Sequence, residues 1–167
     1  MKNLSYLLTL FGIALFVSCN KISNANPIND VASLPSSFGF DARHQKVVAL
    51  FFDKKNGTIA TLYGNDFAFD SASNSLHSHV AGEVYTMVTW KYEANPQWFG
   101  GTVPGELQEV EVLKLVPSKD GYIKDYSRYL GKYLVLDAAV RGSSIRANEM
   151  LHQRTDYMLS QRAALFL

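Results

Sequence analysis

The sequence contains a single cysteine among its 167 residues. One cysteine cannot form a disulfide framework, and a chain of this length can bury a core large enough to fold without one. The length also favours one folded domain rather than two. A charge excess of either sign is missing, since 16 Lys and Arg stand against 15 Asp and Glu. This balance argues against nucleic acid as a partner, because nucleic-acid binding needs clustered Lys and Arg to displace counterions.

The common catalytic and nucleotide-binding signatures are missing too. The sequence has no Gly-x-Ser-x-Gly elbow, no phosphate loop and no zinc-site spacing. The stretch Gly100–Gly105 is rich in glycine but lacks the dinucleotide fingerprint. These absences leave enzymatic activity uncertain and favour a role other than catalysis.

The first residues resemble a targeting signal. Leu4–Val17 is nearly all apolar, follows Lys2, and is too short and too closely followed by polar residues for a membrane span. Phe16-Val17-Ser18-Cys19 then resembles the lipobox of bacterial lipoproteins, although Phe16 stands where Leu is usual. We therefore expect residues 1–18 to be a lipoprotein signal peptide and Cys19 to be lipidated. The protein is then anchored to a membrane of the bacterial cell envelope and faces the periplasm or the outside; the alternative is an ordinary secretory signal with an incidental cysteine.

Two further regions come after the predicted signal. Residues 19–37 are rich in Asn, Ser and Pro and have little apolar periodicity, which predicts a flexible tether. Residues 38–167 form the predicted domain. Its patterns favour an α+β fold, a twisted antiparallel β-sheet with one short helix and a long C-terminal helix packed on it.

The domain's predicted strands and helices are derived from alternation and turn residues. Asn56-Gly57 predicts a type I′ hairpin turn, and Val84 to Trp90 alternate as in a central strand covered on both faces. Asn65 or Asp66 is a candidate helix cap. Strands are expected at residues 46–52, 58–63, 83–92, 107–116 and 122–129, a long ordered loop at 93–105, and helices at 67–73 and 145–165.

Four segments, in order, resemble the cytochrome P-460 family. They are Gly57-Thr58 with a strand into Gly64-Asn65-Asp66-x-Ala68, then Gly82-x4-Met87-Val88-x-Trp90-Lys91, then Pro96-x-Trp98, then Val103-Pro104-Gly105 with Val110-Glu111. The similarity covers about residues 46 to 165 and lies in the series rather than in one motif. It implies an antiparallel sheet with helices and a homodimer. Members of the family carry c-type haem on a Cys-x-x-Cys-His motif near the C-terminus, and act on hydroxylamine or bind nitric oxide.

The chain departs from the family at the haem motif. No cysteine follows Cys19, so covalent attachment of c-type haem is impossible. Thr155–Gln161 resembles the segment just after the family's motif, and counting back places Ile145–Glu149 where Cys-x-x-Cys-His would lie. Both thioether positions and the axial histidine are therefore absent.

Several side chains are candidate binding groups, each with a plainer alternative. His152, one helical turn after Glu149, is a candidate axial ligand for non-covalently held haem, or an ordinary helix histidine. His77 and His79 are spaced so that both rings share one side of an extended segment, a weak metal candidate for which a solvated pair is the favoured alternative. Five aromatic residues are candidates to line an apolar pocket between the sheet and the C-terminal helix, or simply to form the core: Tyr63, Tyr85, Trp90, Trp98 and Phe99.

Two carboxylates are further candidates for this pocket, where they would move protons. The plainer reading makes Asp66 a helix cap and Glu111 a surface residue of a strand. We predict an envelope lipoprotein that binds a small ligand in the pocket, with non-covalent haem as one candidate. A haem-free structural or protein-interaction module of the envelope is the alternative, and a redox enzyme like the haem-bearing relatives is the weakest, because the haem motif is missing.

Overall fold

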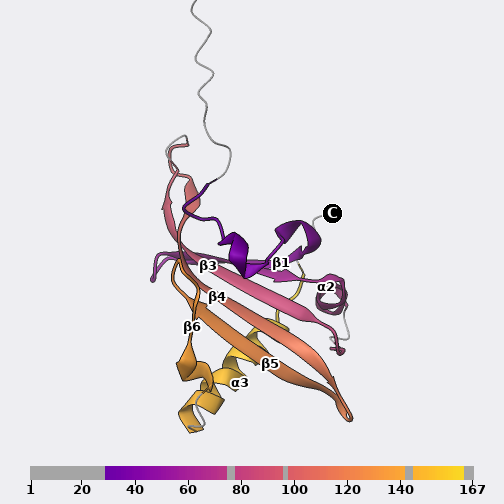
Figure 1. Ribbon diagram of the computed structural model, residues 1–167. Coiled ribbons are helices and arrows are strands. Elements are labelled where there is room, and N and C mark those ends of the chain that lie inside the picture. The colour runs from indigo at the N-terminus through magenta and orange to yellow at the C-terminus, as the bar shows by residue number, and fades with distance from the viewer. Residues whose placement is uncertain (1–28, 75–77, 96–97, 142–144, 164–167) are drawn as a thin grey trace, which may run out of the picture.

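A computed structural model describes residues 29–74, 78–95, 98–141 and 145–163 (Figure 1). One antiparallel sheet has its six strands in the order β1-β2-β3-β4-β5-β6, so each strand pairs with the next one along the chain. The elements are η1 (Ser36–Phe38), η2 (Ala42–His44), β1 (Lys46–Asp53), β2 (Thr58–Gly64), α2 (Asp66–Ser73), β3 (Val84–Ala94), β4 (Thr102–Ser118), β5 (Gly121–Leu130), β6 (Val135–Leu136), η3 (Ala138–Arg141) and α3 (Ile145–Leu159). The predicted α+β class is confirmed. Neither helix in the described ranges has both the length and the apolarity to cross a membrane.

The central strand β3 is covered on both faces, as its alternation predicts. Tyr85 and Met87 lie in a core shared with both helices, and we call this side of the sheet the helix face. Val88 and Trp90 lie in a second core beneath residues 32–38, and we call this side the N-terminal face. Large side chains on both faces of one strand therefore mark the middle of the sheet.

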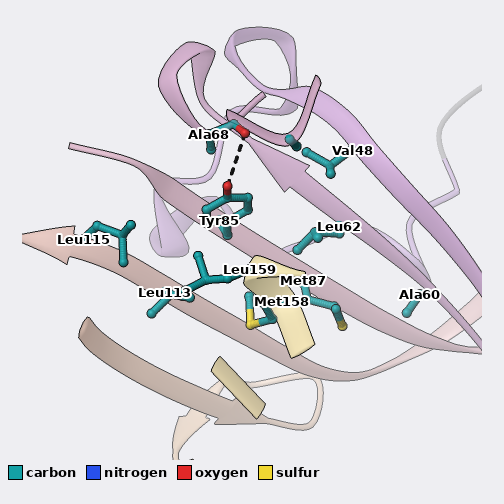
Figure 2. Close-up of a cluster of buried hydrophobic side chains, with 11 residues drawn as sticks. Val48, Ala60, Leu62, Ala68, Tyr85, Met87, Leu113, Leu115, Met158 and Leu159 are labelled. Carbon is teal, nitrogen blue, oxygen red and sulfur yellow. Dashed lines mark hydrogen bonds between the residues drawn. The ribbon is translucent and has the colours of Figure 1, made fainter. Parts of the chain in front are cut away.

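The helix-face core joins both helices to four strands (Figure 2). From α2, Ala68 and Ala72 are buried, as their spacing of four residues predicts. From α3, Met158 and Leu159 pack onto the same cluster. The other buried members come from the strands: Val48, Ala60, Leu62, Tyr85, Met87, Leu113 and Leu115. The C-terminal helix is thus fixed to the sheet by its last turn.

The N-terminal segment is bound to the opposite face. The indole nitrogen of Trp90 donates a hydrogen bond of 2.8 Å to the carbonyl of Ala32. Leu34 and Phe38 pack on the same core, and the Phe38 ring meets Tyr129 edge-on with 5.1 Å between ring centres. The prediction of a flexible tether as far as residue 37 is therefore wrong for residues 29–37. A few spaced apolar side chains suffice to fix the segment because the sheet offers an apolar surface.

The first hairpin forms where predicted, but with a different turn. Asp53 pairs with Thr58, which leaves a loop of four residues rather than the two of a type I′ turn. Gly57 has φ of 66°, while Asn56 keeps a negative φ. The carboxylate of Asp53 accepts hydrogen bonds from the backbone N–H groups of Lys55 (2.9 Å) and Asn56 (3.1 Å). This side-chain acceptor stabilises the wider loop, and its hydrogen bonds lower the pKa of Asp53.

Three other boundaries differ from the sequence predictions. The hairpin between β3 and β4 extends farther than predicted, because Pro104 pairs with Tyr92. This pair lies beyond a register shift, where the missing N–H of a proline is tolerated. The short strand β6 is an addition to the predicted strands. The C-terminal helix ends at Leu159 rather than near 165, and the chain then turns so that the N–H of Ala163 donates to the carbonyl of Ala72 (3.1 Å).

Candidate functional site

A cavity of about 770 Å³ lies between the helix face of the sheet and α3. Its lining residues come from β1 to β5, the first hairpin loop, η3 and α3: Phe51, Asp53, Asn56, Thr58, Ala60, Met87, Thr89, Gln108, Glu109, Glu111, Tyr126, Arg128, Val140, Met150, Leu151, Gln153, Arg154 and Tyr157. The lining is therefore part apolar and part polar, and the size suits a small organic molecule.

A buried carboxylate from the centre of the sheet forms one wall of the cavity. Glu111 on β4 is only 1% exposed. The guanidinium of Arg154 on α3 donates to both of its oxygens, with 2.6 Å from Nε to Oε1. The hydroxyl of Tyr126 on β5 donates to the same Oε1. These hydrogen bonds compensate the charge of Glu111, which would be costly to bury alone. They also connect α3 to the sheet across the cavity.

A second ion pair lies beside the first on the same face. Arg128 on β5 donates from Nε to Glu109 Oε2 at 2.9 Å and also contacts Asp137, with 3.5 Å between Nη1 and Oδ2. Each arginine in the cavity wall is thus already paired with a carboxylate. The two arginines and their carboxylate partners therefore form an array of paired charges, and Asp53 adds a lining carboxylate that accepts from backbone and amide N–H groups.

The titration of two of these groups keeps them protonated. The hydrogen bond to Glu111 raises the pKa of Arg154 further above its ordinary value, so the guanidinium stays charged. Burial, with the negative charge of Glu111, raises the pKa of Tyr126 well above its ordinary value. Neither group releases a proton near neutral pH. Both side chains therefore stay hydrogen-bond donors in the cavity wall.

The five aromatic residues predicted to line a pocket do not line this cavity. Tyr85 is buried in the core below α2, where its hydroxyl oxygen lies 3.2 Å from the carbonyl oxygen of Ala68. Tyr63 and Trp90 lie on the N-terminal face. Trp98 and Phe99 are exposed in the loop between β3 and β4. Alternation places Tyr85 and Trp90 on opposite faces, so no single pocket could contain all five.

The residues around the cavity do not fit haem. His152 is exposed on α3, while its neighbours Leu151 and Gln153 line the cavity. No histidine or cysteine is among the lining residues of the described chain. Met87 has the one buried sulfur there, and this sulfur already accepts a hydrogen bond from Arg154 (3.1 Å). We therefore derive no chemistry through a haem group.

The predicted histidine pair also receives a different role. His79 Nδ1 lies 2.8 Å from Glu83 Oε2, while His77 falls outside the described residues. The candidate carboxylate Asp66 is exposed, begins α2 and pairs with Lys46 (2.9 Å). Across the described chain, no three His, Cys, Asp or Glu side chains are grouped as a metal site requires.

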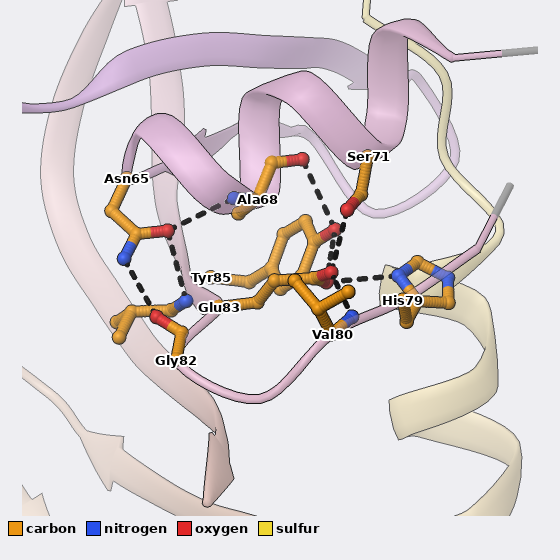
Figure 3. A network of polar contacts seen from close by, with 9 residues as sticks. Asn65, Ala68, Ser71, His79, Val80, Gly82, Glu83 and Tyr85 are labelled. Atoms are coloured by element: carbon orange, nitrogen blue, oxygen red, sulfur yellow. Dashed lines mark hydrogen bonds and ion pairs between the residues drawn. The ribbon is translucent and has the colours of Figure 1, made fainter. Parts of the chain in front are cut away.

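The Glu83 carboxylate is instead the centre of a closed network (Figure 3). It is completely buried and accepts from the Ser71 hydroxyl (2.6 Å), the Val80 backbone N–H (2.6 Å) and the Tyr85 hydroxyl (3.0 Å). Burial, followed by the charge of Glu83, raises the pKa of Tyr85 well above its ordinary value. These contacts join α2, the following loop and β3, and none of them faces the cavity.

Glu111 lines the cavity, as its candidacy as a pocket carboxylate predicts, and the surface alternative is wrong. Arg154 is not among the candidate binding groups, but it lies four residues before the buried Met158 and so shares its side of the helix. Glu111 lies two residues before Leu113 on the same face of β4, and Leu113 is completely buried on the helix face. An arginine and a glutamate, each in phase with a buried residue, are the available signal for this ion pair.

A scan against models of protein families finds no match to the chain, and a search of characterised proteins finds none either. The resemblance to the cytochrome P-460 family thus rests on the four sequence segments alone.

Proposed function

We propose that this protein is a lipid-anchored protein of the bacterial envelope that binds a small molecule in the cavity between the sheet and α3. The cavity itself supports this proposal most directly, since about 770 Å³ of space adjoins a buried, charged side chain. The anchor is inferred from the apolar N-terminal run and Cys19. The domain is proposed to be a cytochrome P-460-like fold without haem.

The charges in the wall favour an uncharged ligand with hydrogen-bonding groups. An anion would have to compete with Glu111 for Arg154 or with Glu109 for Arg128, and a cation that approached either glutamate would have to displace an arginine. Phe51, together with the other apolar lining residues, offers contact for a hydrocarbon or aromatic body. A neutral amphiphilic molecule satisfies both parts of the lining.

The experiment is a screen of uncharged, drug-sized compounds by ligand-observed NMR, with hits confirmed by calorimetry. A cavity-filling variant, Thr89→Phe, places a larger side chain on the floor of the cavity and is expected to weaken hits at least about tenfold. Hits that bind Thr89→Phe as tightly as the unmodified protein would contradict the proposed site.

A matched control comes from the opposite face of the sheet. Ser127 on β5 lines a smaller pocket of about 290 Å³ beneath the N-terminal segment. Ser127→Phe makes a comparable change of size there and is expected to leave the affinity unchanged. Loss of binding in Ser127→Phe alone would show that the ligand binds in the smaller pocket. An absence of hits in the whole screen would favour the structural or interaction module.

A further inference from the structure

The loop between β3 and β4 is unlike the other hairpin loops of the sheet. Trp98 is 74% exposed and Phe99 completely exposed, next to each other in the chain. No charged residue occurs from Ala94 to Gly105. By contrast, lysines occupy the other three hairpin turns, at Lys54 and Lys55, at Lys119 and at Lys132. A pair of large exposed aromatics in an uncharged loop is typical of a surface that meets an apolar partner.

Backbone hydrogen bonds hold the described part of this loop in a compact form. The N–H of Asn95 donates to the carbonyl of Gly101 (2.9 Å), and the N–H of Gly101 donates to the carbonyl of Trp98 (3.0 Å). Gly100 has φ of 77°, which a glycine adopts without strain. The two aromatic rings are thus presented on a closed turn at the end of a long hairpin, rather than on an extended chain.

The N-terminal segment begins beside this hairpin. Asn29 Nδ2 donates a 2.7 Å hydrogen bond to the carbonyl of Pro104, which lies two residues inside β4. In Figure 1 the first described residues run along the hairpin, which projects beyond the rest of the sheet. Asn29 lies only ten positions after Cys19, a distance of at most about 35 Å when fully extended. A membrane that holds Cys19 therefore lies within reach of the loop.

We propose that Trp98 and Phe99 insert into the interface of the lipid bilayer and orient the anchored domain on the membrane. This inference rests on the proposed lipid anchor. Tryptophan prefers the interface because its ring is apolar and its N–H is polar, and phenylalanine adds apolar area. Two aromatics bind a bilayer weakly by themselves. The tether makes the contact effective because it keeps the loop at a high local concentration near the surface.

The test uses the chain from Cys19 onward, which keeps every described residue. Its only thiol is coupled to a maleimide lipid in phosphatidylcholine vesicles, so the protein is tethered at Cys19 whatever happens to that residue in the cell. Tryptophan fluorescence is then measured with brominated phosphatidylcholine as the quencher. We expect quenching of Trp98 together with a blue shift of its emission. Trp98→Phe leaves only the buried Trp90 and is expected to lose most of the quenching.

Two more variants identify the contact. Phe99→Ser is expected to reduce the bromolipid quenching of Trp98 by roughly half, because half of the inserting pair is removed. Ile123→Ser removes an exposed apolar side chain close to the opposite, β4–β5 end of the sheet, and is expected to leave the quenching unchanged. Emission of Trp98 that stays as in water, with no bromolipid quenching, would overturn the proposal.

Two other outcomes are separated by the same design. A blue shift of Trp98 emission that depends on protein concentration and not on lipid would show that the loop contacts a second copy of the chain. This result would overturn the membrane proposal. Mass spectrometry of Cys19 in the membrane fraction of an expressing bacterium tests the anchor independently. An unmodified Cys19 would refute the anchor, whereas the vesicle result reports on the loop alone.

Discussion

Two buried carboxylates, Glu83 and Glu111, lie near the two helices of the protein and have different surroundings. Glu83 is completely buried next to α2, where Ser71, Val80 and Tyr85 donate to it. His79 Nδ1 lies 2.8 Å from its Oε2. Glu111 is buried almost as deeply, but its partners include the full positive charge of an arginine from α3. One carboxylate belongs to a closed network, and the other forms the wall of a cavity.

The difference shows which buried charge is available for function. The partners of Glu83 come from within 12 positions in the sequence, so the network fixes the local fold between α2 and β3. Arg154 is 43 positions from Glu111, and their contact sets how α3 lies over the sheet. A perturbation at Glu83 should therefore change stability, while one at Glu111 should also change the cavity.

The largest expected effect is that of Glu83→Ala. Removal of the carboxylate leaves the buried Ser71 hydroxyl and the Val80 N–H without their acceptor, in a space that alanine does not fill. We expect a loss of roughly 3–5 kcal/mol in the free energy of unfolding. The measurement is urea unfolding followed by circular dichroism.

Glu83→Gln is the matched variant, since it keeps the shape and one acceptor oxygen. It should lose less stability than Glu83→Ala. A loss below about 1 kcal/mol for the alanine variant would show that water replaces the carboxylate and that the network is not the structural centre of this region.

A smaller effect is expected when the Glu111–Arg154 pair is broken. Glu111→Gln should cost about 2 kcal/mol, because the arginine keeps part of its side chain in water and can be solvated there. Hydrogen exchange should quicken in α3 more than in β3. Unchanged hydrogen exchange in α3 would contradict the proposed difference between Glu111, which positions α3, and Glu83, which fixes the local fold.

The coupling between the two charges can be isolated by a double-mutant cycle. Arg154→Gln and the double variant complete the cycle, and we expect a coupling energy of about 1 kcal/mol, reduced by solvent screening of the exposed part of Arg154. A coupling near zero would mean that burial alone holds α3 on the sheet.

Strand positions and faces are largely predictable from the sequence because each depends on local periodicity. The alternation of Tyr85, Met87 and Val88 places β3 at the centre of the sheet, and Asn65 caps α2 as its position suggests, accepting from the Ala68 N–H at 3.0 Å. The predictions that fail depend on distant contacts. The docking of residues 29–37 requires the acceptor at Ala32 to meet Trp90, which is 58 positions away.

The candidate site is less predictable than the fold, for a physical reason. Aromatic residues are expected to line a pocket, yet large apolar rings are more effective at filling a core than at leaving a space. The cavity remains where charged groups from the sheet and α3 oppose each other, at Glu111 and Arg154. The phase of each residue with a buried neighbour indicates its face, but no local pattern predicts that Glu111 and Arg154 pair with each other.

The last expected effect distinguishes the two regions through their tyrosines. Tyr85 donates to Glu83 and Tyr126 donates to Glu111, and burial raises the pKa of both phenols above the ordinary value of 10.0. A raised pKa in the folded state gives stability that is complete below pH about 10 and is lost as pH rises above it, because the unfolded chain then releases protons that the folded chain keeps. Each such tyrosine contributes a slope of about 1.4 kcal/mol per pH unit.

Removal of one phenol should therefore flatten the alkaline limb. Between pH about 10 and about 11.5, the free energy of unfolding of Tyr126→Phe should fall less steeply than that of the unmodified protein, by up to about 1.4 kcal/mol per pH unit. Tyr133→Phe is the control, because Tyr133 is 88% exposed, and its slope should match the unmodified protein. Lysines titrate in all three proteins and cancel in the comparison. If Tyr126→Phe and Tyr133→Phe give equal slopes, water reaches the Tyr126 hydroxyl through the cavity. The cavity wall at Glu111 is then more hydrated than the closed network at Glu83, by more than the burial of the two carboxylates suggests.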